Sequence, residues 1–66
     1  MCKTIGGLDC DLVTITEKGD YQEMRAKKAV VISARVHPGE TVSSWMMRGV
    51  LFFLTDPDNH EALLLR

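Results

Sequence analysis

The clearest periodicity in the chain covers residues 42–54, where apolar or small side chains recur at spacings of three and four residues. The positions that follow this spacing are Val42, Trp45, Met46, Gly49, Val50 and Phe53. Such spacing predicts a helix, and Met47, Leu51 and Phe52 widen its apolar stripe beyond an ordinary amphipathic face. We therefore expect a helix buried on most of its circumference, much of whose surface would face water in the chain taken alone.

Two upstream runs have the composition of strands. Residues 29–34 are an unbroken series of small and β-branched residues, which is typical of an interior strand covered on both faces. Residues 11–16 predict a second, shorter strand, because β-branched residues dominate them. Between the two, residues 17–28 carry charges of both signs, which indicates a solvated connection or a short charged helical turn. An interior strand needs neighbours and covering helices, so we expect an α/β class and a larger parent fold.

The C-terminal part predicts a second helix. Asp56-Pro57 matches a helix N-cap followed by proline at the first helical position, which places the helix over residues 58–66. The chain ends on Leu63-Leu64-Leu65-Arg66 without a polar tail. We take this ending as the mark of a cut within a longer sequence.

Length and composition narrow the function classes. The chain has 66 residues, of which 45% are hydrophobic, so it needs a core. A chain of this length, however, buries on folding only about 60% of the surface that it exposes when unfolded. Its net charge of -1 provides no basic field for nucleic acid or an anionic membrane. We find no signal peptide and no stretch long enough to cross a membrane, and Cys2 and Cys10 are expected to be reduced thiols. We therefore expect a cytoplasmic protein that has neither nucleic acid nor membrane as a partner.

The candidate chemistry lies between the predicted interior strand and the long helix. The sequence there is Arg35-Val36-His37-Pro38-Gly39-Glu40-Thr41. His37 precedes a proline, which keeps it extended, and Pro38-Gly39 allows a sharp turn that brings Glu40 beside it. An imidazole nitrogen and a carboxylate oxygen are good zinc ligands, and the positive end of the following helix favours an ionised Glu40. The alternative is an ordinary turn, because short patterns such as H-x-x-E also recur by accident.

A longer resemblance supports the metal hypothesis. Residues 31–47 resemble the zinc-site segment of the cytosolic carboxypeptidases, a branch of the zinc metallocarboxypeptidase family, and residues 12–16 and 63–66 are similar to its flanks. Val42 departs from the asparagine expected in that pattern. The resemblance implies that His37 and Glu40 bind Zn²⁺. It also implies that residues 1–66 form a partial catalytic domain, a strand-loop-helix fragment of a mixed-sheet zinc carboxypeptidase domain.

The resemblance further implies an activity and its partners. The family removes C-terminal or side-chain-linked glutamates, so the expected partners are peptide or protein C-terminal tails, notably those of tubulin. The third zinc ligand, the general base and the substrate-gripping arginines are expected beyond Arg66, so we assign no catalytic residue here and expect the chain alone to be inactive. His60 and Glu61 are expected to face solvent rather than to replace the missing groups, and Arg35 to form an ion pair beside the site.

Two alternatives from other classes stay open. One is a truncated, non-catalytic fragment that serves as an interaction or regulatory piece. The other is an unrelated α/β binding domain in which residues 37–40 are only a turn.

Overall fold

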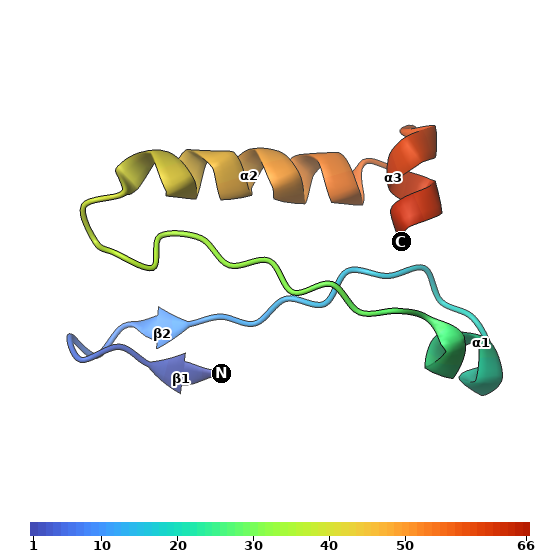
Figure 1. The fold of residues 1–66 in the computed structure, drawn as a ribbon, viewed down its shortest axis with the longest axis horizontal. Helices are drawn as coiled ribbons and strands as arrows, with labels where there is room; N and C mark the ends of the chain where they lie inside the picture. The colour runs from blue at the N-terminus through green and yellow to red at the C-terminus, as the bar shows by residue number, and fades with distance from the viewer.

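The chain begins with a small hairpin, and two long irregular stretches follow, one before and one after the first helix (Figure 1). The computed structural model describes all of residues 1–66. Its hairpin consists of β1 (Cys2–Lys3) and β2 (Asp9–Cys10), and the helices are α1 (Tyr21–Ala26), α2 (Thr41–Thr55) and α3 (His60–Leu65). The chain is a small mixed α/β arrangement, so the predicted α/β class is confirmed at this coarse level.

The turn of the hairpin sets its register. The Thr4 amide donates to the Leu8 carbonyl at 2.8 Å, and the Leu8 amide donates to the Thr4 hydroxyl at 3.0 Å. Gly7 takes a φ of 84°, a conformation that costs glycine little and other residues much more. The strands are antiparallel, with Cys2 opposite Cys10 and with Lys3 opposite Asp9, to which it is ion-paired.

Neither predicted strand forms. Residues 11–16 and 29–34 belong to no helix or strand, and Val30 and Val31 are 83% and 90% exposed. Both runs keep the composition of strands, but a strand is stabilised by hydrogen bonds to a neighbour, and within this chain they find none. The predicted interior strand that leads into the loop at His37 is therefore wrong for the chain as it stands.

The long helix is confirmed, and so is the exposure expected of it in the chain taken alone. α2 begins at Thr41 and ends at Thr55, within one residue of the predicted bounds at each end. None of its residues is buried, and Trp45 and Phe52 are 68% and 63% exposed. The Arg48 guanidinium lies 5.7 Å from the Trp45 ring centroid and 5.0 Å from that of Phe52, close enough for cation–π attraction. Of the other elements only α3 packs against α2, so most of its apolar surface has no partner.

The short helices are fixed by their caps. Asp20 and Glu23 form a capping box at the start of α1, so the helical-turn alternative for residues 17–28 is confirmed. The predicted start of the last helix is wrong, because Asn59 rather than Asp56 is its N-cap and its side chain accepts from the Ala62 amide at 3.0 Å. Asp56 instead ends α2, and its carboxylate accepts from the Asp58 amide at 2.9 Å in the connecting turn.

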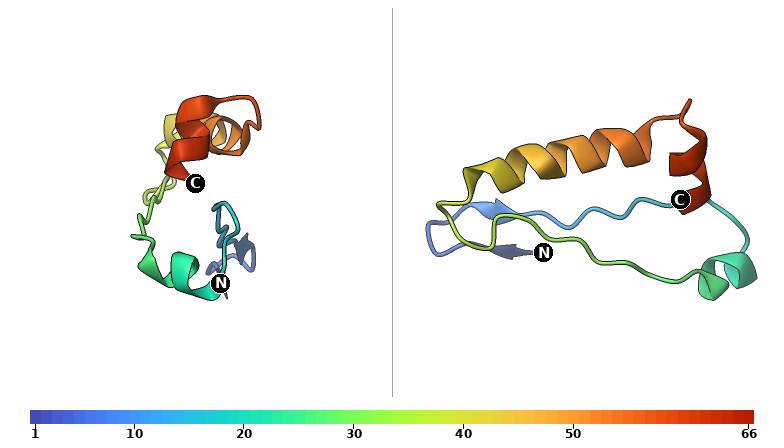
Figure 2. Two further views of the ribbon diagram at one scale, coloured as in Figure 1. Left: turned by 90° about the vertical axis from the view of Figure 1, so that its right-hand side faces the viewer. Right: turned by 45° about the horizontal axis from the view of Figure 1, so that its top comes forward.

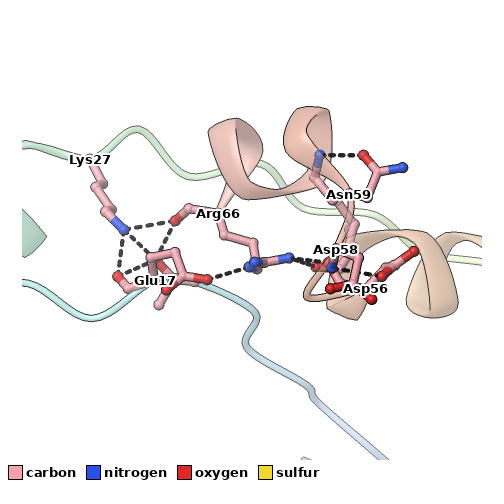
Figure 3. Close-up of polar contacts among 9 residues, drawn as sticks. Glu17, Lys27, Asp56, Asp58, Asn59 and Arg66 are labelled. Carbon is pink, nitrogen blue, oxygen red and sulfur yellow. Dashed lines mark hydrogen bonds and ion pairs between the residues drawn. The ribbon is translucent and has the colours of Figure 1, made fainter.

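A polar cluster joins α3 to a distant part of the chain (Figure 3). The Arg66 side chain contacts the Glu17 carboxylate at 2.5 Å and donates to the main-chain oxygens of Leu54 and Asp56 at 2.8 and 3.1 Å. The Lys27 ammonium donates to the main-chain oxygens of Glu17 and Arg66 at 2.6 and 2.7 Å. These bonds, rather than apolar packing, hold α3 to the segment before α1.

The chain is open rather than closely packed, as both views in Figure 2 show. Ala62 is its one buried residue. The radius of gyration is 14.4 Å, against about 11 Å for a compact domain of this length, and the accessible surface is 6216 Å², against about 4,200 Å² for a folded monomer of this mass. No helix has the length and apolar character that a membrane span requires. The chain therefore has no apolar core of its own.

Candidate metal centre

The loop before α2 is a tight turn, as predicted. The Glu40 amide donates to the His37 carbonyl at 3.1 Å, which leaves Pro38 and Gly39 at the centre of the turn. No helix continues through Pro38. Positive φ, however, is not found at Gly39 but at Arg35, whose φ is 56°. The left-handed backbone conformation therefore lies two residues before His37 and not within the Pro38-Gly39 turn.

His37 and Glu40 converge across this turn. Their side chains approach to 3.3 Å between Nδ1 and Oε1, and the His37 amide donates to Oε2 of the same carboxylate at 3.4 Å. The side chains are 77% and 53% exposed. The predicted convergence is confirmed, and the pair is open to solvent.

Glu40 is the N-cap residue of α2, but its side chain does not cap the helix. The other two helices are capped by side chains, those of Asp20 and Asn59. At Glu40 the backbone has φ -85° and ψ 58°, outside the extended region that an N-cap usually takes. The carboxylate is thus directed to His37 rather than to the free amides of the first helical turn.

The separation of the two donor atoms fits one shared zinc ion. Ligand atoms that each lie 2.0–2.1 Å from a tetrahedral zinc are about 3.3–3.4 Å apart, and Nδ1 and Oε1 are 3.3 Å apart. The same distance suits a hydrogen bond when no metal is bound. No third side chain completes the set, because no three His, Cys, Asp or Glu residues in the chain gather closely enough to hold a metal.

Arg35 supports the turn without forming the ion pair that the sequence suggested. Its Nε donates to the Pro38 carbonyl at 3.1 Å, and its Nη1 lies 3.5 Å from the Ser44 hydroxyl. Arg35 takes part in no ion pair, since the Glu40 carboxylate faces His37. Its role is therefore to join the turn to the start of α2 through neutral oxygens.

A shallow groove runs beside the pair and was not predicted from the sequence. It measures about 280 Å³ and lies between residues 32–36 and the N-terminal half of α2. Its lining is Ile32, Ser33, Ala34, Arg35, Val36, Glu40, Ser43, Met46, Met47 and Val50. The apolar residues of this surface predict a buried strand and a buried helix, and neither prediction implies an open groove.

The remaining histidine and its neighbour are separate from the site. His60 and Glu61 lie exposed in the first turn of α3, as predicted. Neither takes part in a hydrogen bond or ion pair with His37 or Glu40.

Comparison with known proteins identifies the family. The chain is 49% identical to cytosolic carboxypeptidase 2 of Mus musculus and 48% identical to that of Homo sapiens, in both cases over its whole length. It is 43% identical over 97% of its length to cytosolic carboxypeptidase 4 of Homo sapiens. The chain spans only 6–8% of the length of these relatives.

No family model and no solved structure matches the chain. Identity at this level over all or nearly all of the chain is not compatible with an unrelated binding domain. The chain therefore belongs to the cytosolic carboxypeptidase family.

Proposed function

We propose that His37 and Glu40 are two protein ligands of a catalytic zinc ion, in a carboxypeptidase of which this chain is a segment. The observation that carries the proposal is their approach to 3.3 Å across the turn, in a chain related throughout to cytosolic carboxypeptidases. A catalytic zinc site uses three protein ligands, commonly two His and one Glu, with a fourth position left open.

Each part of the loop has a role in this proposal. His37 presents Nδ1, the ring nitrogen that faces the carboxylate, while the amide bond to Oε2 orients Glu40. Arg35 fixes the turn from outside through the Pro38 carbonyl. A zinc ion held here would act as a Lewis acid on a substrate carbonyl and would activate water for attack. The segment thus positions the metal, and the third ligand and the general base are supplied elsewhere in the protein.

The substrate class follows from the family resemblance. We propose that the whole protein is cytoplasmic and removes C-terminal glutamates from polyglutamylated protein tails, such as those of tubulin. Within this chain the groove beside Glu40 is largely apolar, and we assign no substrate-gripping residue to it. Recognition of a terminal carboxylate is left to residues outside this segment.

The 66-residue chain by itself should bind zinc weakly and should not hydrolyse peptides. It provides two ligands and no further group near them, so the metal would exchange readily. A non-catalytic interaction role is the second candidate, and the exposed apolar surface of α2 favours it. Full-length protein without peptidase activity would support that alternative.

The test measures zinc content and glutamate release from a polyglutamate-tailed peptide by the full-length protein. His37→Ala and Glu40→Gln should each remove most of the zinc and the activity. His60→Ala and Glu61→Gln are matched controls, because they change the same residue types at exposed positions outside the turn, and they should alter neither quantity. Unchanged zinc content in both site variants would overturn the proposal.

A further inference from the structure

The N-terminal hairpin places the chain's two cysteines directly opposite each other. Cys2 on β1 pairs with Cys10 on β2 in the antiparallel register, and both are free thiols. Their side chains lie on the same face of the ladder, since residues that are directly opposite in an antiparallel pair project to one side. The ion pair between Lys3 and Asp9, the adjacent pair of the ladder, supports the same register.

We propose that Cys2 and Cys10 are a redox-modifiable pair that forms an intramolecular disulfide by exchange with a small-molecule disulfide such as oxidised glutathione. Opposed residues in an antiparallel ladder have Cα atoms about 4.5–5.5 Å apart, within the 4.4–6.8 Å range of disulfides. Their Cβ atoms, about 4.5–5.5 Å apart in such pairs, need only a small approach to reach disulfide distance. A ladder of two residue pairs resists that approach little.

The chemistry is ordinary thiol–disulfide exchange. The thiolate of one cysteine attacks a sulfur of oxidised glutathione, and one glutathione thiolate leaves as a mixed disulfide forms. The second cysteine, once deprotonated, then attacks the protein sulfur of that mixed disulfide and expels the second glutathione. The protein loses two electrons and two protons, and one molecule of oxidised glutathione becomes two of the reduced form.

Accessibility and charge set how the exchange proceeds. Cys2 is exposed and Cys10 is half-buried, so an oxidant can reach the pair. Interaction with Cys10, chiefly a hydrogen bond between the thiols, raises the pKa of Cys2. Because the thiolate is the reacting form, exchange should accelerate as the pH rises above neutrality.

The test equilibrates the 66-residue chain with mixtures of reduced and oxidised glutathione and then traps free thiols by alkylation. Trypsin cleaves after Lys3 and Lys18, so the intramolecular disulfide appears as the peptide of residues 1–3 linked to that of residues 4–18. We expect this species to form at a rate independent of protein concentration. The equilibrium constant for its formation from glutathione gives the effective concentration of one cysteine thiol at the other. We expect this effective concentration to be at least about tenfold above the millimolar value that a flexible linker would give.

Two comparisons isolate the contribution of the hairpin. Gly7→Val keeps both thiols and strains the positive φ of the turn, and nothing lies within 4 Å of the added Cβ. In this variant, and in the wild-type chain in urea, the effective thiol concentration should fall to the value of a flexible linker. Equal constants in all three samples, intermolecular dimers as the main product, or persistent free thiols would each overturn the proposal.

Discussion

Glu40→Asp should separate the two demands on position 40, those of the helix and those of the metal. Glu40 is at the N-cap of α2 without capping it, because its carboxylate faces His37. Aspartate keeps the negative charge at the helix N-terminus and is among the preferred N-cap residues. Its side chain is one methylene shorter, so it suits the amides of the first turn better than the His37 ring. The variant should therefore stabilise α2 and weaken metal binding.

The expected gain in the stability of α2 is that of one side-chain cap. A side-chain cap is worth about 1 kcal/mol, and the attraction of a carboxylate to the helix dipole is the same in both residues. Part of the gain is lost if ψ at position 40 stays near 58°, because the cap requires a more extended backbone. A gain approaching 1 kcal/mol corresponds to about a fivefold change in the opening equilibrium of the first turn. Zinc affinity should fall at least about tenfold, since even outer partners of a metal contribute that much.

The assay pairs amide hydrogen exchange in the first turn of α2 with zinc titration against a chromophoric chelator. Exchange at Val42 and Ser43, the amides that the shorter carboxylate would cap, should slow in the variant. Glu61→Asp is the matched control, because Glu61 is an exposed residue in the first turn of α3, and it should leave both readouts unchanged. Faster exchange together with unchanged zinc affinity would instead show that Glu40 is a structural residue and not a metal ligand.

Three further predictions concern other elements. Gly49→Ala should stabilise α2 by about 1 kcal/mol, because the added Cβ meets nothing within 4 Å and alanine favours helix more than glycine does. Thermal unfolding followed by circular dichroism measures this, and a lower unfolding midpoint in the variant would contradict it. Asn59→Ala should destabilise α3 by about 1 kcal/mol, because the Ala62 amide loses its cap. Amide hydrogen exchange in α3 should become faster, and unchanged exchange would count against the prediction. Cys10 raises the pKa of Cys2, so alkylation of Cys2 by iodoacetamide should reach its half-maximal rate at a higher pH in the wild type than in Cys10→Ala. Coincident pH profiles of the two proteins would show that Cys10 has no such effect.

The features that could be predicted from the sequence are those set by neighbouring residues. α2 follows from periodicity within its own 15 residues, and the turn at residues 37–40 follows from the local preferences of Pro38-Gly39. The predicted strands failed because a strand depends on a distant partner, and residues 29–34 find none in this chain. The start of α3 was misplaced because both Asp56 and Asn59 are good N-caps, and only the turn after α2 decides between them.

In the site, too, the features set by neighbouring residues could be predicted and the others could not. The approach of His37 to Glu40 spans three residues and is therefore a local property. Arg35 was predicted to form an ion pair, yet its guanidinium donates to two neutral oxygens, the Pro38 carbonyl and the Ser44 hydroxyl. The residue type does not reveal this choice of partners. The cluster of Glu17, Lys27 and Arg66 joins residues up to 49 positions apart, and no sequence signal pairs them.

Shared metal binding by His37 and Glu40 is tested most directly by a zinc titration of the 66-residue chain, followed by NMR of its imidazole rings. The chain has two histidines, so His60 serves as an internal control for His37. We expect zinc to shift the His37 ring resonances while those of His60 stay in place. We also expect Glu40→Gln to remove most of the His37 response. Equal shifts of both rings, or a His37 response that is unchanged by Glu40→Gln, would contradict the claim that His37 and Glu40 bind one metal ion together.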